Sequence, residues 1–66
     1  MKQIRFSENL KELRKEKRIT QGALAKVLGV DQRTISAWEN GICEPNYATL
    51  LKLCEFFDES IEDMLT

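Results

Sequence analysis

Apolar side chains recur along the chain at the three- and four-residue spacing of α-helices, and no stretch alternates as a strand would. Residues that can cap a helix stand before or at the start of each periodic segment. They are Ser7, Thr20, Asp31, Asn46 and Ser60. Gly29 and Gly41 stand where the second and third helices should end. The pattern predicts an all-α, compact five-helix domain over residues 1–66, with helices at about 7–17, 21–28, 32–40, 47–57 and 61–65.

The segment between Gly29 and Gly41, "GVDQRTISAWENG", is too short for a stable isolated helix. On a helical wheel, Ile35 and Trp38 define its buried side. Thr34 and Glu39 flank that side. The outward positions are Gln32, Arg33, Ser36, Ala37 and Asn40.

A polar outer face is ordinary for a surface helix, so simple solvation is one interpretation of these outward residues. A second interpretation follows from the preceding helix, because two short helices joined by a tight turn form a helix-turn-helix, whose second member enters the DNA major groove. Gln32 and Arg33 open that helix, and their paired hydrogen-bonding groups match adenine and guanine edges. The free amides of a helix N-terminus also favour phosphate.

The formal net charge of −1 conceals a strong asymmetry between the two halves of the chain. Residues 1–33 contain nine Lys and Arg against four acidic residues, a balance of +5. Residues 34–66 contain one Lys against seven acidic residues, a balance of −6. This asymmetry suggests a basic end that meets phosphates, although two oppositely charged solvated faces would give the same counts.

Composition argues against several other functions. The chain has no His, which removes the commonest general base and most zinc sites, so we expect no enzyme, metal or cofactor. Cys43 and Cys54 form no CxxC motif, and we expect small buried apolar groups rather than a disulfide. No apolar run approaches the roughly 20 residues that cross a bilayer. We therefore expect a cytoplasmic protein.

Several motifs in order resemble the helix-turn-helix family of phage repressors, Cro proteins and their bacterial relatives. They are "LKELRKEKRITQ", "LAKVLGV", "TISAWENG", the "EP" of the following loop, and "LLKLCEFF". The resemblance covers nearly the whole chain. It implies five helices in one domain, double-stranded operator DNA as the partner, and binding as a two-fold homodimer.

The resemblance also implies roles for particular residues. Base edges would be read by Gln32, Arg33, Ser36 and Ala37. Gln21 would contact phosphate and support the third helix, and Arg14 would form an ion pair with Glu39. Lysines lack a planar fork, so those that reach DNA should act as point charges on phosphate. The full expected set of backbone contacts is Gln21, Thr34, Asn40, Arg14, Lys11, Lys15 and Lys17.

The chain also departs from the family pattern. The loop after Gly41, often basic in the family, reads Ile42, Cys43, Glu44, which puts one set of phosphate contacts in doubt. Arg18 and Asp58 occupy helix ends where relatives often have Gly, so we expect left-handed backbone there. Glu59 replaces a common apolar residue.

The C-terminal segment offers apolar residues for a dimer interface, namely Ile61, Met64 and Leu65. The alternative is that these side chains only close the core of the monomer. The leading hypothesis is a sequence-specific DNA-binding transcriptional regulator that occupies an operator, for example as a repressor. The alternative is a protein-interaction module of the same fold, of the antitoxin or anti-repressor type, whose apolar C-terminal end binds a protein.

Overall fold

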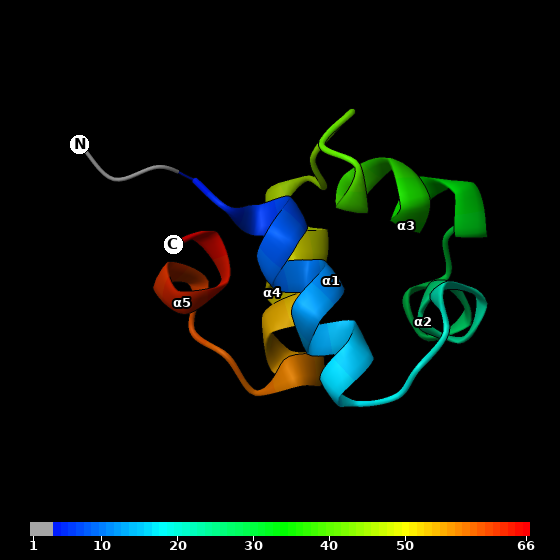
Figure 1. Ribbon diagram of the computed structural model, residues 1–66, viewed down its shortest axis with the longest axis horizontal. Coiled ribbons are helices and arrows are strands. Elements are labelled where there is room, and N and C mark those ends of the chain that lie inside the picture. Colours follow the sequence, from blue (N-terminus) through cyan, green and yellow to red (C-terminus); the bar gives the residue numbers. More distant parts are fainter. Residues whose placement is uncertain (1–3) are drawn as a thin grey trace.

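The computed structural model describes residues 4–66, and within them the chain forms helices joined by short connections (Figure 1). The helices are α1 (Phe6–Glu16), α2 (Gln21–Leu28), α3 (Gln32–Glu39), α4 (Tyr47–Phe57) and α5 (Ile61–Leu65). In Figure 1, α5 lies on one side of α1 and α4, whereas α2 and α3 lie on the other. The all-α expectation is confirmed. The expected bounds of the second, fourth and fifth helices are correct.

The start of α1 differs from the expectation. Ser7 lies inside the helix, and the N-cap is Arg5, whose side chain makes no capping hydrogen bond. Instead the backbone N–H of Arg5 donates to the carbonyl of Leu65 at 2.6 Å. A contact with the far end of the chain therefore sets this helix start, and no local sequence pattern reports it. At its other end, α1 stops at Glu16 rather than at residue 17.

The other helix starts follow local capping rules. The side chains of Thr20, Asp31, Asn46 and Ser60 each accept a backbone N–H from the first turn of their helix. The end of α3 lies one residue earlier than expected, with Asn40 as its C-cap. Arg18 and Asp58 both have φ of 55°, so the expectation of left-handed backbone at these two residues is confirmed.

The core contains one fully buried large side chain from every helix: Leu10, Leu24, Ile35, Leu53 and Met64. This arrangement explains how helices as short as α2 and α3 are stable, since their stability comes from packing rather than from helix propensity. Cys54 is buried as expected, whereas Cys43 is exposed.

The position of Met64 corrects one expectation. Its side chain has no exposed surface, so it belongs to the monomer core and is not available to a dimer interface. Ile61 and Leu65 are half-buried and pack against the same core. Asn9 of α1 fixes α5 further, because its side-chain amide donates to the carbonyls of Met64 at 2.9 Å and Asp63 at 3.3 Å.

Across residues 4–66, every helix is too short or too polar to span a bilayer. The same part of the chain contains no group of three or more potential ligands arranged to hold a metal ion.

Candidate nucleic-acid interface

The start of α3 projects from the molecule while the rest of the helix is anchored. Ile35 is fully buried and Trp38 is 4% exposed, whereas Gln32 and Arg33 are exposed. Asp31 caps the helix by accepting the backbone N–H of Arg33 at 2.8 Å. This hydrogen bond, with weaker help from the Arg33 side chain, lowers the pKa of Asp31. The Arg33 side chain is 93% exposed, and its Nε lies 3.4 Å from Asp31 Oδ1; a pair this exposed is weak and leaves the guanidinium able to turn to a ligand.

The remaining outward residues of α3 are less accessible than the wheel suggests. Thr34, Ser36 and Ala37 are half-buried, and Asn40 is exposed. The Asn40 amide donates to the hydroxyl of Ser36 at 3.3 Å, so these two side chains are linked in the free protein. The first turn of α3 thus offers the most exposed polar groups of this helix, and its second turn offers a shallower surface.

The end of α3 is fixed by Glu39, which the helical wheel placed on a flank but which is only 9% exposed. Arg14 of α1 donates to both of its carboxylate oxygens, Nε to Oε2 at 2.5 Å and Nη2 to Oε1 at 3.0 Å. The expected ion pair is therefore present and bidentate. Arg14 also donates to the carbonyl of Ile19 at 3.0 Å, and Gln21 of α2 donates to Glu39 at 3.2 Å. Three helices meet at this carboxylate.

The electrostatics of this network follow from its geometry. Burial alone would raise the pKa of Glu39, but the hydrogen bonds from Arg14 and Gln21, with the charges of Arg14 and Lys11, outweigh burial and lower it. The hydrogen bond to Glu39 is also the main reason that the pKa of Arg14 is raised. Both groups are therefore charged across the physiological pH range.

This network corrects the expected role of Arg14 as a contact to the DNA backbone. Its side chain is 14% exposed, and its donors point inward to Glu39 and Ile19. Gln21 was expected to support the third helix, and its side-chain amide does so by donating a hydrogen bond to Glu39 of α3.

The lysines of α1 separate into two groups. Lys11 and Lys15 are exposed, four residues apart, and share a face with Ser7, which lies beside Gly41 at the end of α3. Lys17 instead places its ammonium 5.3 Å from the ring centroid of Phe56 in α4. This cation–π contact directs Lys17 toward α4, which argues against its expected role as a contact to the DNA backbone.

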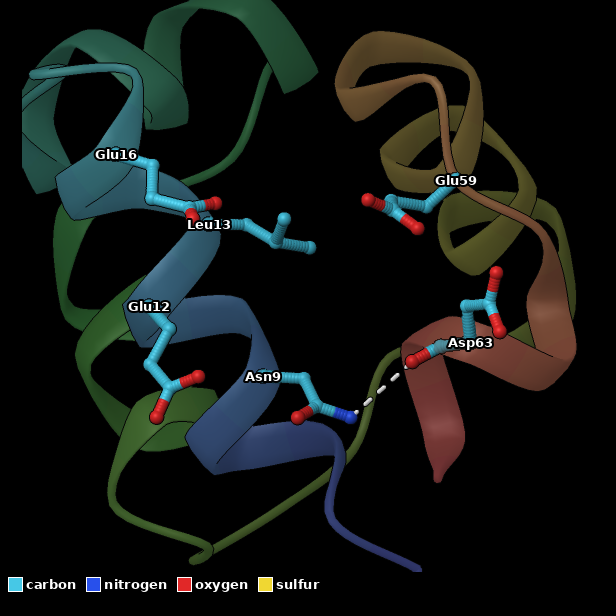
Figure 2. Close-up of a pocket in the computed structure, with 6 residues that line it drawn as sticks. All are labelled: Asn9, Glu12, Leu13, Glu16, Glu59 and Asp63. Atoms are coloured by element: carbon cyan, nitrogen blue, oxygen red, sulfur yellow. Dashed lines mark hydrogen bonds between the residues drawn. The ribbon is translucent and has the colours of Figure 1, made fainter.

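An acidic pocket lies between α1 and the C-terminal part of the chain (Figure 2). Figure 2 shows the carboxylates of Glu16 and Glu59 pointing toward each other across Leu13, with Asp63 below Glu59 and Glu12 lower on α1. The volume of this acidic pocket is about 110 Å³. The charge counts of the two halves of the chain did not show that α1 has both a basic side and an acidic side. The signal was the four-residue spacing of Glu8, Glu12 and Glu16, which places carboxylates along one side of that helix.

The loop after α3 presents no positive charge. Ile42 is 76% exposed, and Cys43 and Glu44 are exposed beside it. Any phosphate contact in this region must therefore come from backbone N–H groups or from the side chains of α1 and α3.

Comparison with known proteins finds helix-turn-helix relatives of this chain. Residues 10–64 match the model of a family described as helix-turn-helix. The chain belongs to this family. It is 42% identical over 60 residues to the uncharacterized HTH-type transcriptional regulator YqaE of Bacillus subtilis, covering 91% of this chain and 52% of that protein. It is 31% identical over 61 residues to the cryptic phage CTXphi transcriptional repressor RstR of Vibrio cholerae, covering 92% of this chain and 55% of RstR.

Solved structures share the fold. A transcriptional regulator from Listeria innocua superposes with a TM-score of 0.93 at 31% identity, over 97% of this chain and 60% of that one. A hydroxypropylphosphonic acid epoxidase from S. wedmorenis gives a TM-score of 0.84 at 32% identity, but this chain covers only 32% of it. The chain spans about half the length of YqaE and RstR. The family model and the regulator-named relatives group this domain with the helix-turn-helix domains of transcriptional regulators.

Proposed function

We propose that this chain binds double-stranded operator DNA in a sequence-specific manner and regulates transcription by occupying the operator. The observation that carries the proposal is the start of α3. Two exposed side chains with forked hydrogen-bonding groups, Gln32 and Arg33, stand at the start of a helix that buried Ile35, Trp38 and Glu39 anchor to the core. A polar helix start on a fixed scaffold suits the major groove.

The proposal gives each residue of α3 a distinct task. Gln32 would make two hydrogen bonds to an adenine edge, and Arg33 two to a guanine edge. Ser36 and Ala37, one turn later, would approach the groove floor, where the methyl group of Ala37 suits the methyl group of thymine.

Phosphate contacts would surround this reading surface. Lys11 and Lys15 on α1, Gln21 at the start of α2, and Thr34 and Asn40 on α3 are the side chains that we assign to the DNA backbone. They would fix the position of α3 without reading sequence. The acidic pocket of Figure 2 supports the same orientation, since carboxylates repel phosphate and would turn α5 away from DNA.

We also propose that two copies bind one operator, with their α3 helices about 34 Å apart to match successive major grooves. After the assignment of Met64 to the core, Ile61 and Leu65 are the C-terminal apolar residues with some accessible surface. Sedimentation with and without operator tests this proposal. Only monomer at high concentration in both conditions would refute it.

The reading function is tested on operator sites selected from a random DNA pool. Arg33→Ala should cost about 1 to 3 kcal/mol on the selected site and relax the preference at one base pair. Binding to scrambled duplex should change much less. Lys15→Ala is the matched control. It should weaken binding to both duplexes alike and reduce the slope of affinity against salt by about one unit.

Two results would contradict the proposal. If Arg33→Ala and Gln32→Ala both leave the operator preference intact, α3 is not the reading helix. If the chain binds no DNA even at low salt, the protein-interaction module becomes the better interpretation, because phosphate contacts are strongest under that condition.

A further inference from the structure

An open groove of about 540 Å³ is lined by α2 and by Val30 and Gln32. Gly22 of α2 lies on one side, and Gln32 of α3 on the other. A Cβ atom built on Gly22 would lie 3.3 Å from the Oε1 atom of Gln32 and 3.9 Å from its Cδ atom. A Cβ at position 22 would therefore crowd the end of the Gln32 side chain, which would have to move by a few tenths of an ångström.

Backbone conformation does not explain a glycine at this position. Gly29 and Gly41 have positive φ, whereas Gly22 does not and lies in the regular helical part of α2. Glycine is less favourable than alanine by about 0.8 to 1.0 kcal/mol in a helix interior, and this figure is an upper bound for Gly22, the second residue of α2. Apart from the Thr20 hydroxyl at 4.0 Å, the Gln32 carboxamide is all that a Cβ would approach within 4 Å.

We infer that Gly22 determines sequence specificity by setting the orientation of the Gln32 carboxamide, although it has no side chain with which to touch DNA. The inference rests on the proposed function, in which Gln32 reads a base. Reading by two hydrogen bonds requires the oxygen and nitrogen of the carboxamide to be placed together. The absence of a side chain at position 22 thus leaves room for the Gln32 carboxamide in the orientation that reads a base.

The substitution Gly22→Ala separates this effect from folding. A contact of 3.3 Å is tighter than ordinary van der Waals packing, so the exposed end of Gln32 is the group that must move, and the added Cβ then opposes its return to the position from which it would read a base. The two helices therefore keep their positions, and alanine improves helix propensity. We expect an equal or higher melting temperature. Discrimination at the base pair that Gln32 reads should fall about fivefold to tenfold, a part of what a bidentate contact supplies.

The experiment compares the full chain with Gly22→Ala, Gln32→Ala and the double variant. Each protein is measured against the selected operator, against duplexes with one base pair changed, and against a scrambled duplex. The double variant is the matched control, because added bulk at position 22 should not alter base preference once the carboxamide is gone. Nuclear Overhauser effects between the Gly22 Hα protons and the Gln32 side-chain amide test the contact without DNA.

Support requires that Gly22→Ala and Gln32→Ala lose preference at the same base pair, and that the double variant matches Gln32→Ala. If Gln32→Ala loses that preference while Gly22→Ala keeps it, the inference is overturned and the proposed function stands. If Gln32→Ala changes nothing, Gln32 is not a reader, and the role of Gly22 fails with it. Unfolding of Gly22→Ala would also overturn the inference, because the added methyl group should displace only the Gln32 carboxamide and leave the helices in place.

Discussion

Removal of Arg14 should destabilise the protein far more than removal of an exposed arginine. Arg14→Ala leaves the Glu39 carboxylate, whose side chain is 2% exposed, with only the Gln21 amide as a hydrogen-bond donor. It also removes the donor to the Ile19 carbonyl. Loss of one partner of a buried ion pair costs about 3 to 5 kcal/mol. Because Arg14 is partly accessible to water, we expect a smaller cost, about 2 to 4 kcal/mol at pH 7.

This cost is large for a chain of 66 residues, whose total stability should be about 3 to 10 kcal/mol. Urea denaturation followed by the fluorescence of the single tryptophan, buried Trp38, measures it. The matched control is Arg5→Ala. Arg5 pairs with Glu8 at 3.0 Å, but both side chains are more than half exposed, so the expected loss is about 0 to 1 kcal/mol.

Acidification should reduce the difference between the wild-type protein and Arg14→Ala. In the wild type the pKa of Glu39 is lowered, so its stabilising contribution is present above the unfolded pKa and is lost as pH falls through the folded value. In the variant, burial without Arg14 should raise the pKa of Glu39, and protonation then relieves an unfavourable charge. A cost below about 1 kcal/mol at pH 7, typical of a surface pair, would refute this reasoning. An equal cost at pH 7 and pH 4 would also refute it.

Three further results are expected. Arg18→Gly and Asp58→Gly should leave the fold unchanged and be neutral or stabilising by about 0 to 1 kcal/mol, since both residues have φ of 55° and the freer unfolded chain offsets part of the gain. A drop of several degrees in melting temperature would contradict this. Glu59→Gln should stabilise the protein at low salt by relieving the acidic pocket, and its benefit should shrink in 1 M salt, where charges are screened beyond about 3 Å; an equal benefit at both salt concentrations would argue against repulsion. A thiol reagent should label exposed Cys43 at once and Cys54 only on unfolding, because burial raises the pKa of the Cys54 thiol and blocks access to it; equal labelling rates would exclude that picture.

The local sequence of this protein determines where most of its helices begin and end. Thr20, Asp31, Asn46 and Ser60 cap helices in the structure because a side-chain oxygen and the backbone N–H groups it accepts are only two or three residues apart. The left-handed backbone at Arg18 was predicted from the family resemblance, because relatives often have Gly at that helix end. The polar start of α3 was equally readable, since it needs only the helical period and two buried apolar residues.

Tertiary structure decided the features that join distant segments. The start of α1 depends on the carbonyl of Leu65, which lies 60 residues away, and therefore no capping pattern could show it. Met64 was expected at an interface because Ile61, Met64 and Leu65 offer more apolar surface than one short terminal turn needs, and only the assembled core shows that Met64 is fully buried. The position of the Gln32 carboxamide near Gly22 depends on how α2 and α3 pack together. Sequence fixes such contacts only through the packing of the whole chain, because a periodic pattern specifies which side of a helix is buried but not which atoms it meets.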